Sequence, residues 1–179
     1  MRLFVGIDLP WELRTRIVAL ATTGIQGARW VPPENYHLTL RFIGEVPPHC
    51  AEEIDMVLAV LRGRRFELTL SGVGTFSKGG RSNTLYVGVE RNPRLEHVQN
   101  KIETALQRVG LDPERRRFQP HVTLARLDNA PEFKLGAFVQ AHNLFRAEAF
   151  VVEHFTLFSS QLGKEQSVYT AEVEYDLAA

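Results

Sequence analysis

The sequence has little cysteine, no long apolar run and no excess charge of either sign. Its one cysteine, Cys50, excludes an internal disulfide framework and a multi-cysteine zinc site. No apolar stretch approaches the length of a membrane span, and residues 1–8 lack the apolar core of a signal peptide. Lysine plus arginine equals aspartate plus glutamate, at 21 each, so the chain lacks the global cationic field that coats long nucleic acid. These absences favour a cytoplasmic protein that does not enter a membrane.

Size and composition are those of a globular protein with one domain or two tightly joined lobes. The chain has 179 residues, of which 44% are apolar and 23% are charged. A balanced net charge is compatible with a small anionic ligand, or with one RNA end held in a local patch. The sequence indicates no obligate protein partner.

The most informative feature is a four-residue pattern that occurs twice. Residues 37–40 are His-Leu-Thr-Leu and residues 121–124 are His-Val-Thr-Leu, each after an entry marked by proline. Both segments are typical of a short strand, in which alternate side chains share one face. Each histidine then stands beside its threonine, while the aliphatic residues face the other way.

The distance between the two histidines aligns more of the chain than these segments. The offset is 121 − 37 = 84 residues, and it matches Phe66 with Phe150. It also matches residues 85–90 with residues 169–174, within two further predicted strands. Helix pairs with helix and strand with strand in one register without a gap, which indicates an internal duplication.

The predicted fold is α+β, with two pseudo-symmetric lobes that each have a small, mainly antiparallel sheet backed by helices. We predict one bilobal domain over residues 1–179, with repeat units at about 10–92 and 93–177 and a central cleft between the lobes. Hydrophobic periodicity predicts helices at 11–21, 51–61 and 95–109, and strands at 3–9, 37–43, 66–70, 84–90, 119–126, 149–159 and 168–177. The strand at 3–9 is expected outside the repeat, and 72–83 as a glycine-rich connection. Periodicity does not decide the structure of 131–142.

Two histidine–threonine pairs around one cleft have the equipment for acid–base chemistry on a phosphate ester. An imidazole titrates near pH 6.5, so one ring can accept a proton while the other donates one. Threonine hydroxyls can donate hydrogen bonds to phosphate oxygens as charge grows on them. A single copy would most simply be an ordinary strand, but the repeat favours catalysis. Metal ligation by His37 and His121 is disfavoured, because no third ligand recurs at the same offset.

The chain resembles the two-histidine phosphoesterase superfamily, and within it the bacterial RNA 2′,3′-cyclic phosphodiesterases, also called 2′-5′ RNA ligases. The resemblance covers residues 4–8, 30–45 and 118–126 and extends to the closing strands. It implies opening of a terminal 2′,3′-cyclic phosphate to a 2′-phosphomonoester without a metal or other cofactor. The residue roles it implies are His37 as the proton donor to the leaving 3′ oxygen, His121 as the base that activates water, and Thr39 and Thr123 as phosphate ligands.

The repeat breaks its own symmetry five residues after each histidine. Phe42 stands where the second copy has Arg126. An aromatic ring on one side and a guanidinium on the other suit a base and a phosphate, respectively, and the resemblance implies the same roles. Strict alternation places Phe42 on the opposite face from His37, and Arg126 on the opposite face from His121. These roles therefore require a bulge or a twisted strand end.

Several alternatives share these residues. Ligation of a 2′-phosphorylated end to a 5′-hydroxyl, or hydrolysis of a small cyclic nucleotide, would use the same site, and a non-catalytic module could bind phosphorylated RNA ends. Phe42 could instead be a core residue, and Arg126 a surface charge. The arginine clusters at 62–65 and 115–117 are expected to be solvated, and the second is the better candidate for contact with an RNA backbone.

Overall fold

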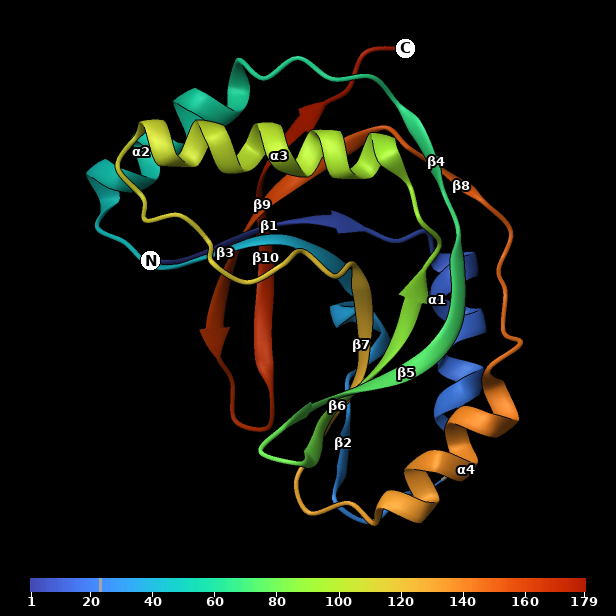
Figure 1. Ribbon diagram of the computed structural model, residues 1–179. Helices are drawn as coiled ribbons and strands as arrows, with labels where there is room; N and C mark the ends of the chain where they lie inside the picture. The colour runs from blue at the N-terminus through green and yellow to red at the C-terminus, as the bar shows by residue number, and fades with distance from the viewer. Residues whose placement is uncertain (23) are drawn as a thin grey trace.

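The computed structural model describes residues 1–22 and 24–179 and has the predicted α+β composition (Figure 1). Its helices are α1 (Trp11–Val18), α2 (Pro48–Ala59), α3 (Pro93–Arg108) and α4 (Glu132–His142), with short 3₁₀ turns η1 (Ala19–Thr22) and η2 (Pro33–Asn35). Its strands are β1 (Arg2–Asp8), β2 (Ala28–Trp30), β3 (His37–Glu45), β4 (Phe66–Leu68), β5 (Leu70–Lys78), β6 (Arg81–Val89), β7 (His121–Leu127), β8 (Phe150–Val152), β9 (His154–Leu162) and β10 (Ser167–Asp176). Figure 1 shows α2 and α3 together at one end of the molecule, and α1 and α4 at the other.

The two histidine strands lie side by side at the centre of the main sheet. Its order is β10-β9-β1-β3-β7-β6-β5, with β2 beside β7, and β4 pairs separately with β8. The named strand pairs are all antiparallel. β3 and β7 meet only at Leu38 and Val122, which are related by the 84-residue offset. The pseudo-symmetric centre of the fold therefore lies between the two motifs, as expected for a shared cleft.

Each lobe takes strands from both halves of the chain. The late strands β9 and β10 lie beyond β1, on the His37 side, whereas the early strand β5 lies beyond β6, on the His121 side. The prediction that residues 3–9 lie outside the repeat was wrong, because β1 flanks β3 as β6 flanks β7. Gly6 opposes Thr39 and Tyr86 opposes Thr123, an offset of 86 − 6 = 80 residues. A fixed offset of 84 could not align these two strands.

The second difference from the sequence prediction concerns the glycine-rich connection at 72–83. Strand β5 extends to Lys78, and a turn at Gly79 and Gly80, both with positive φ, leads directly into β6. Gly74 serves close packing inside the strand, because an added Cβ would lie 2.6 Å from the Tyr86 hydroxyl. The undecided segment 131–142 contains α4, which buries only Leu135 and Phe138 and therefore has a weak helical pattern.

The aliphatic residues of both motifs form the floor beneath the histidines. Leu38, Leu40, Val122 and Leu124 are all buried in the main hydrophobic core. The histidine–threonine face of the same strands is only half-buried. Because the aliphatic face is buried in the core, the histidine–threonine face is directed toward the cleft. No helix in residues 1–22 or 24–179 is long and apolar enough to cross a membrane.

Candidate active site

Both motif strands carry the bulge that the predicted site requires. In β3, Thr39 opposes Gly6 and Arg41 opposes Val5, so Leu40 is skipped. In β7 the register with β6 skips Leu124 in the same way, and 124 − 40 is again 84. A bulge shifts the alternation by one residue. Residues 42 and 126 therefore return to the face of the histidines and threonines.

Burial along the two strands confirms this change of face. From His37 to Phe42 the side chains are half-buried, buried, half-buried, buried, buried and exposed, and the same order runs from His121 to Arg126. Phe42 is 52% exposed and is not a core residue. All six residues predicted for the site are thus at least partly accessible on one face.

Each histidine is fixed in one tautomer by the backbone two residues before it. The Nδ1–H of His37 donates to the Asn35 carbonyl at 2.8 Å, and that of His121 donates to the Gln119 carbonyl at 2.7 Å. A carbonyl can only accept, so Nδ1 holds the proton and Nε2 keeps its lone pair when the ring is neutral. In the first motif, the Thr39 hydroxyl donates to the Nε2 of His37 at 2.8 Å.

The ring of His37 lies within a group of aromatic side chains. The centroids of Phe4, Tyr169 and Phe158 are 4.7, 5.2 and 6.1 Å from its own, and Tyr169 presents its edge at 90°. Phe42 extends this group outward, with its ring 6.0 Å from Phe4. The imidazole therefore has few waters around it, which disfavours its charged form.

His121 has a different pair of aromatic neighbours. Phe76 and Tyr86 stack on each other at 4.3 Å and lie 4.8 and 5.6 Å from the imidazole, each turned steeply to its plane. No described residue donates a hydrogen bond to its Nε2 or to the side-chain hydroxyl of Thr123. The second motif therefore presents an imidazole nitrogen and a hydroxyl that are both available to a ligand.

The electrostatics connect the two halves of the site. Burial lowers the pKa of His37 to about 4, against the opposing effects of the Asn35 carbonyl and of Asp8. Burial also lowers the pKa of His121. The charge of Arg126 lowers the pKa of both rings, and protonated His121 lowers that of His37. These groups therefore act within one local field, in which bound anionic phosphate would be stabilised.

A buried arginine holds the turn that leads into His37. Arg14 donates from Nε to the Leu9 carbonyl at 2.8 Å and from Nη1 to the Pro33 carbonyl at 2.6 Å. The side-chain amide of Asn35, in the same turn, donates from Nδ2 to the Ser167 carbonyl on β10 at 2.9 Å. The carbonyl that orients His37 is thereby fixed to two other elements.

A second buried arginine joins β3 to the basic loop before β7. Arg41 donates from Nε to Glu103 on α3 at 2.8 Å and from Nη1 to the Phe42 carbonyl at 2.5 Å. Its Nη2 donates to the Asp112 carbonyl, at the start of the loop that carries Arg115–Arg117. The loop is thus fixed close to Phe42 and to the end of the motif strand.

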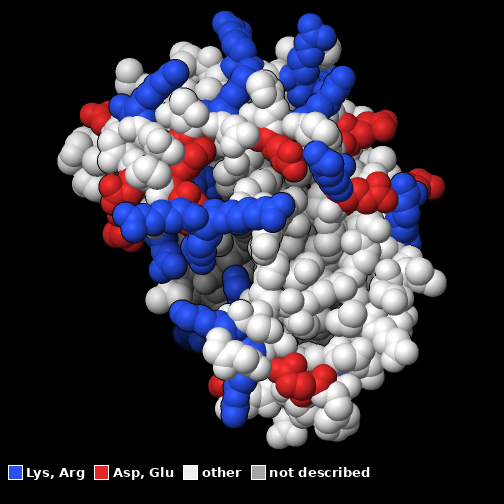
Figure 2. Space-filling model, in the orientation of Figure 1, with Lys and Arg blue, Asp and Glu red and all other residues white. Residues whose placement is uncertain are grey.

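The cleft opens on a face with many cationic side chains. Figure 2 shows a hollow between β10 and β7, with Lys and Arg side chains gathered on its rim, over the loop after α3 and near the β5–β6 hairpin. Within the part of the chain that the structure describes, no group of three or more His, Cys, Asp or Glu side chains could hold a metal ion. The cleft is suited to an anion held by hydroxyl, imidazole and guanidinium groups.

The aromatic side chains around the two histidines were not predicted from the sequence. Phe4 belongs to the quoted opening segment, but its contact with His37 depends on the pairing of β1 with β3. Phe158 and Tyr169 come from the far end of the chain, because β9 and β10 cross into the His37 lobe. One signal was present in the sequence. At the 84-residue offset, Phe158 of β9 aligns with Gly74 of the first repeat, so the second repeat has an aromatic ring where the first has none.

A family model described as the 2′-5′ RNA ligase superfamily matches residues 12–164. The chain belongs to this superfamily. Among its relatives, an RNA 2′,3′-cyclic phosphodiesterase of Aeropyrum pernix is 41% identical over 63% of this chain and 64% of its own length. One from Escherichia coli is 31% identical over 94% of this chain and 92% of its own length.

Solved structures of other proteins share the fold over nearly the whole chain. E. coli LigT complexed with 3′-AMP is 29% identical and superposes with a TM-score of 0.82, covering 99% of this chain and 98% of its own. TT0787 of Thermus thermophilus is 25% identical with the same TM-score, covering 98% and 97%. The bilobal arrangement of strands around a central pair is therefore that of the superfamily.

Proposed function

We propose that this protein is an RNA 2′,3′-cyclic phosphodiesterase that opens a terminal cyclic phosphate to a 2′-phosphomonoester by two-histidine acid–base catalysis. The observation that carries the proposal is the repeated tether: on adjacent strands, His37 and His121 each donate Nδ1–H to a backbone carbonyl, which leaves Nε2 for proton transfer. The names of the relatives support the same reaction. The residues themselves supply every proton transfer that the hydrolysis needs.

The proposed step balances protons and bonds around a single phosphorus atom. The Nε2 of neutral His121 takes a proton from water, and the water oxygen attacks phosphorus. The bond from phosphorus to the 3′ oxygen breaks, and the Nε2–H of protonated His37 donates its proton to that oxygen. Thr39, Thr123 and Arg126 donate hydrogen bonds to the non-bridging oxygens, where negative charge grows. The product is a 2′-phosphomonoester with a free 3′-hydroxyl.

The low pKa of His37 makes substrate binding part of the mechanism. In the free protein this ring is neutral at neutral pH, because burial holds its pKa near 4. A bound phosphate anion beside it favours the imidazolium form, in the same direction as Asp8 on β1. In the proposed mechanism, the bound phosphate therefore raises the pKa of His37 and favours the charged donor that the step requires.

Phe42 and the basic loop support an RNA end as the substrate. An exposed ring beside the aromatic group of His37 can stack on the base of the terminal nucleotide. The exposed arginines 115–117 belong to the loop after α3, where cationic side chains gather on the rim of the hollow (Figure 2), and they can contact phosphates farther up the strand. Since the chain has a single free cysteine and no sign of a disulfide framework, we place this reaction in the cytoplasm.

Product analysis tests the proposed function. A dinucleotide that ends in a 2′,3′-cyclic phosphate is incubated with the protein, with and without EDTA, and the products are separated by chromatography. We expect a 2′-phosphate product at the same rate in both samples. A 3′-phosphate product would change which oxygen leaves, and loss of turnover in EDTA would contradict metal-independent catalysis. Binding without turnover would show a recognition module, and joining of RNA ends would show ligation.

A further inference from the structure

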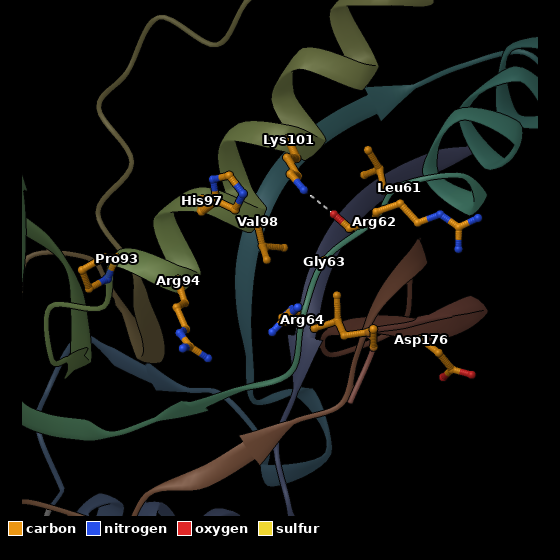
Figure 3. A pocket seen from close by; sticks show the side chains of 12 residues that line it. Leu61, Arg62, Gly63, Arg64, Pro93, Arg94, His97, Val98, Lys101 and Asp176 are labelled. Carbon is orange, nitrogen blue, oxygen red and sulfur yellow. Dashed lines mark hydrogen bonds between the residues drawn. The ribbon is translucent and has the colours of Figure 1, made fainter.

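A cavity that shares no lining residue with the cleft lies beside the first half of α3 (Figure 3). Its volume is about 780 Å³, within the usual range for a small-molecule site. One wall is the first half of α3, and the other is the segment 61–64 with the end of β10. Leu61, Val98 and Leu177 contribute apolar surface.

The charge around this cavity is nearly all positive. Arg62, Arg64, Arg94 and Lys101 line it together with His97, whereas Asp176 is its one acidic residue. In Figure 3 the guanidinium groups of Arg64 and Arg94 point into the gap between the walls, and Asp176 points away from it. A chain with no net charge thus concentrates cations around one apolar hollow, which raises the local concentration of anions.

The cations of the cavity are not neutralised by neighbouring carboxylates. Arg14, Arg41 and Arg146 elsewhere in the molecule each form an ion pair with a carboxylate. Arg65, directly after the cavity segment, lies 3.9 Å from Glu153. None of the four permanent cations of the cavity is within ion-pair distance of a described acidic residue. The cavity therefore has unpaired positive charge available to a ligand.

The walls of the cavity are fixed by backbone and side-chain hydrogen bonds. The Ala178 N–H donates to the Gly63 carbonyl, and the Arg65 N–H donates to the Ala178 carbonyl, both at 2.8 Å. Lys101 donates to the Arg62 carbonyl, a bond drawn in Figure 3. A Cβ at Gly63 would lie 3.1 Å from Leu177 and 3.6 Å from Val98, so the absence of a side chain lets this segment pack closely against both residues. The site is therefore preformed rather than assembled by the ligand.

From this geometry we propose that the cavity is a second binding site, distinct from the catalytic cleft, for a nucleotide-like phosphate ester. Guanidinium forks match phosphate oxygens in pairs, and several cations suit a group with more than one negative charge. The apolar side chains suit the base or sugar of the same ligand. This ligand chemistry could come from a free nucleotide or from a nucleotide within an RNA strand.

Amide NMR titration of the full chain with 5′-AMP tests the proposal, because it reports the two sites separately. We expect saturable shifts at Gly63, Val98 and Leu177 besides those in the cleft. The double variant Arg64→Gln/Arg94→Gln should weaken binding at the cavity by at least about tenfold, since it removes two charge-assisted contacts. Arg65→Gln is the matched control, because this neighbouring arginine is outside the cavity, and it should retain binding.

Catalytic turnover distinguishes this proposal from the proposed function. Hydrolysis of a 2′,3′-cyclic mononucleotide should be unchanged in the double variant, whatever occupies the cavity. If an RNA octamer shifts the same amides and its KM alone rises in the double variant, the occupant is part of an RNA strand. If AMP binds there and the octamer does not, the occupant is a free nucleotide.

Three results would overturn the proposal. One is the absence of shifts at the cavity with both AMP and the octamer. Another is equal binding by the wild type and the double variant. The third is binding of inorganic phosphate as tight as that of AMP, because the apolar surface would then contribute nothing.

Discussion

The two histidine strands have the same backbone design but different surroundings. Each has a carbonyl tether two residues before the histidine, a bulge three residues after it and an exposed side chain two residues later. Around His37 the neighbours are aromatic, and Thr39 already occupies its Nε2. Around His121, neither the Nε2 nor the Thr123 hydroxyl has a hydrogen-bond partner in the described chain. Duplication thus supplied a symmetric frame, and substitution around it produced two unequal imidazoles.

The aromatic substitution follows a simple exchange of large and small residues. Phe158 lies against Gly6 in the His37 lobe, where an added Cβ would be 3.4 Å from its ring. Tyr86 lies against Gly74 in the His121 lobe. Gly6 and Tyr86 are equivalent positions, because they oppose the two motif threonines, Thr39 and Thr123. Each lobe therefore has one aromatic ring packed against a glycine. The ring comes from β9 in the His37 lobe and from β6 in the His121 lobe.

Removal of either histidine should have the largest effect on turnover, and it tests whether both strands are catalytic. His37→Ala and His121→Ala should each lower kcat for a 2′,3′-cyclic nucleotide by about 10²- to 10⁴-fold, because each removes one proton transfer. Affinity for the 2′-phosphate product should change much less. Steady-state kinetics and product titration measure both effects. If one variant kept near-normal turnover, only the other imidazole would be catalytic.

The exposed pair Phe42 and Arg126 tests whether the two sides bind different parts of the nucleotide. Arg126→Ala should raise the Kd for inorganic phosphate and for product by about 10- to 100-fold, because it removes charge-assisted hydrogen bonds. Phe42→Ala should raise the Kd for nucleotides by a similar or smaller factor, through lost stacking, and leave that for inorganic phosphate unchanged. Calorimetry with both ligands separates the two. Equal effects of Phe42→Ala on both ligands would contradict its stacking role.

The aromatic side chains around His37 should keep the pKa of His37 below that of His121. In the free protein we expect the His37 ring to titrate near pH 4 and His121 at a higher pH that is still below 6.5. Tyr169→Ala admits water to His37 and should raise its pKa toward the ordinary value, whereas Tyr86→Ala should not affect it. Proton NMR of the imidazole rings measures both. A His37 pKa at or above that of His121 would contradict the role of these rings.

The same pKa values predict how stability depends on pH. The folded pKa of His37 is below its unfolded value near 6.5, so the unfolded chain binds more protons between about pH 4 and 6.5. The free energy of unfolding should therefore fall as the pH is lowered through this window. Urea unfolding at pH 7 and pH 5 measures the change, which should be smaller in Tyr169→Ala. An equal or larger change in that variant would oppose this explanation.

The two exchanged glycines give the smallest expected effect. A Cβ at Gly6 would lie 2.9 Å from the Leu38 carbonyl oxygen, a backbone atom held in the central strand. At Gly74 the close atom is the Tyr86 hydroxyl, at the end of a side chain that can move. Gly6→Ala should therefore lower the free energy of unfolding by about 1–3 kcal/mol, and Gly74→Ala by less. Denaturant unfolding checks the order, and the reverse order would show that Tyr86 is the more rigid neighbour.

The sequence predicted what depends on local pattern and repetition. The α+β composition, the central pair of motif strands and the need for a bulge all followed from the spacing of His37, Thr39 and their copies 84 residues later. The bulges themselves lie at Leu40 and Leu124, and neither residue differs from an ordinary strand leucine. Their positions depend on pairing with β1 and β6, which no local pattern records.

What the sequence could not predict depends on strand order. Phe158 and Tyr169 reach His37 only because β9 and β10 lie beyond β1, on the opposite side from the rest of the second repeat. Arg62 and Arg64 are exposed, as predicted, but the cavity that they line forms only because the end of β10 lies beside them. Contacts between residues more than 100 positions apart were thus the main omission, since hydrophobic periodicity contains no information on which strands become neighbours.

The most direct test of the shared site is a titration of ¹⁵N-histidine-labelled protein with a 2′-phosphorylated nucleotide, followed at the imidazole Nε2 resonances. If both rings contact one phosphate, the signals of His37 and His121 will shift toward the protonated form together, with one Kd and saturation at one equivalent. A response from only one ring, or two different Kd values, would contradict the account.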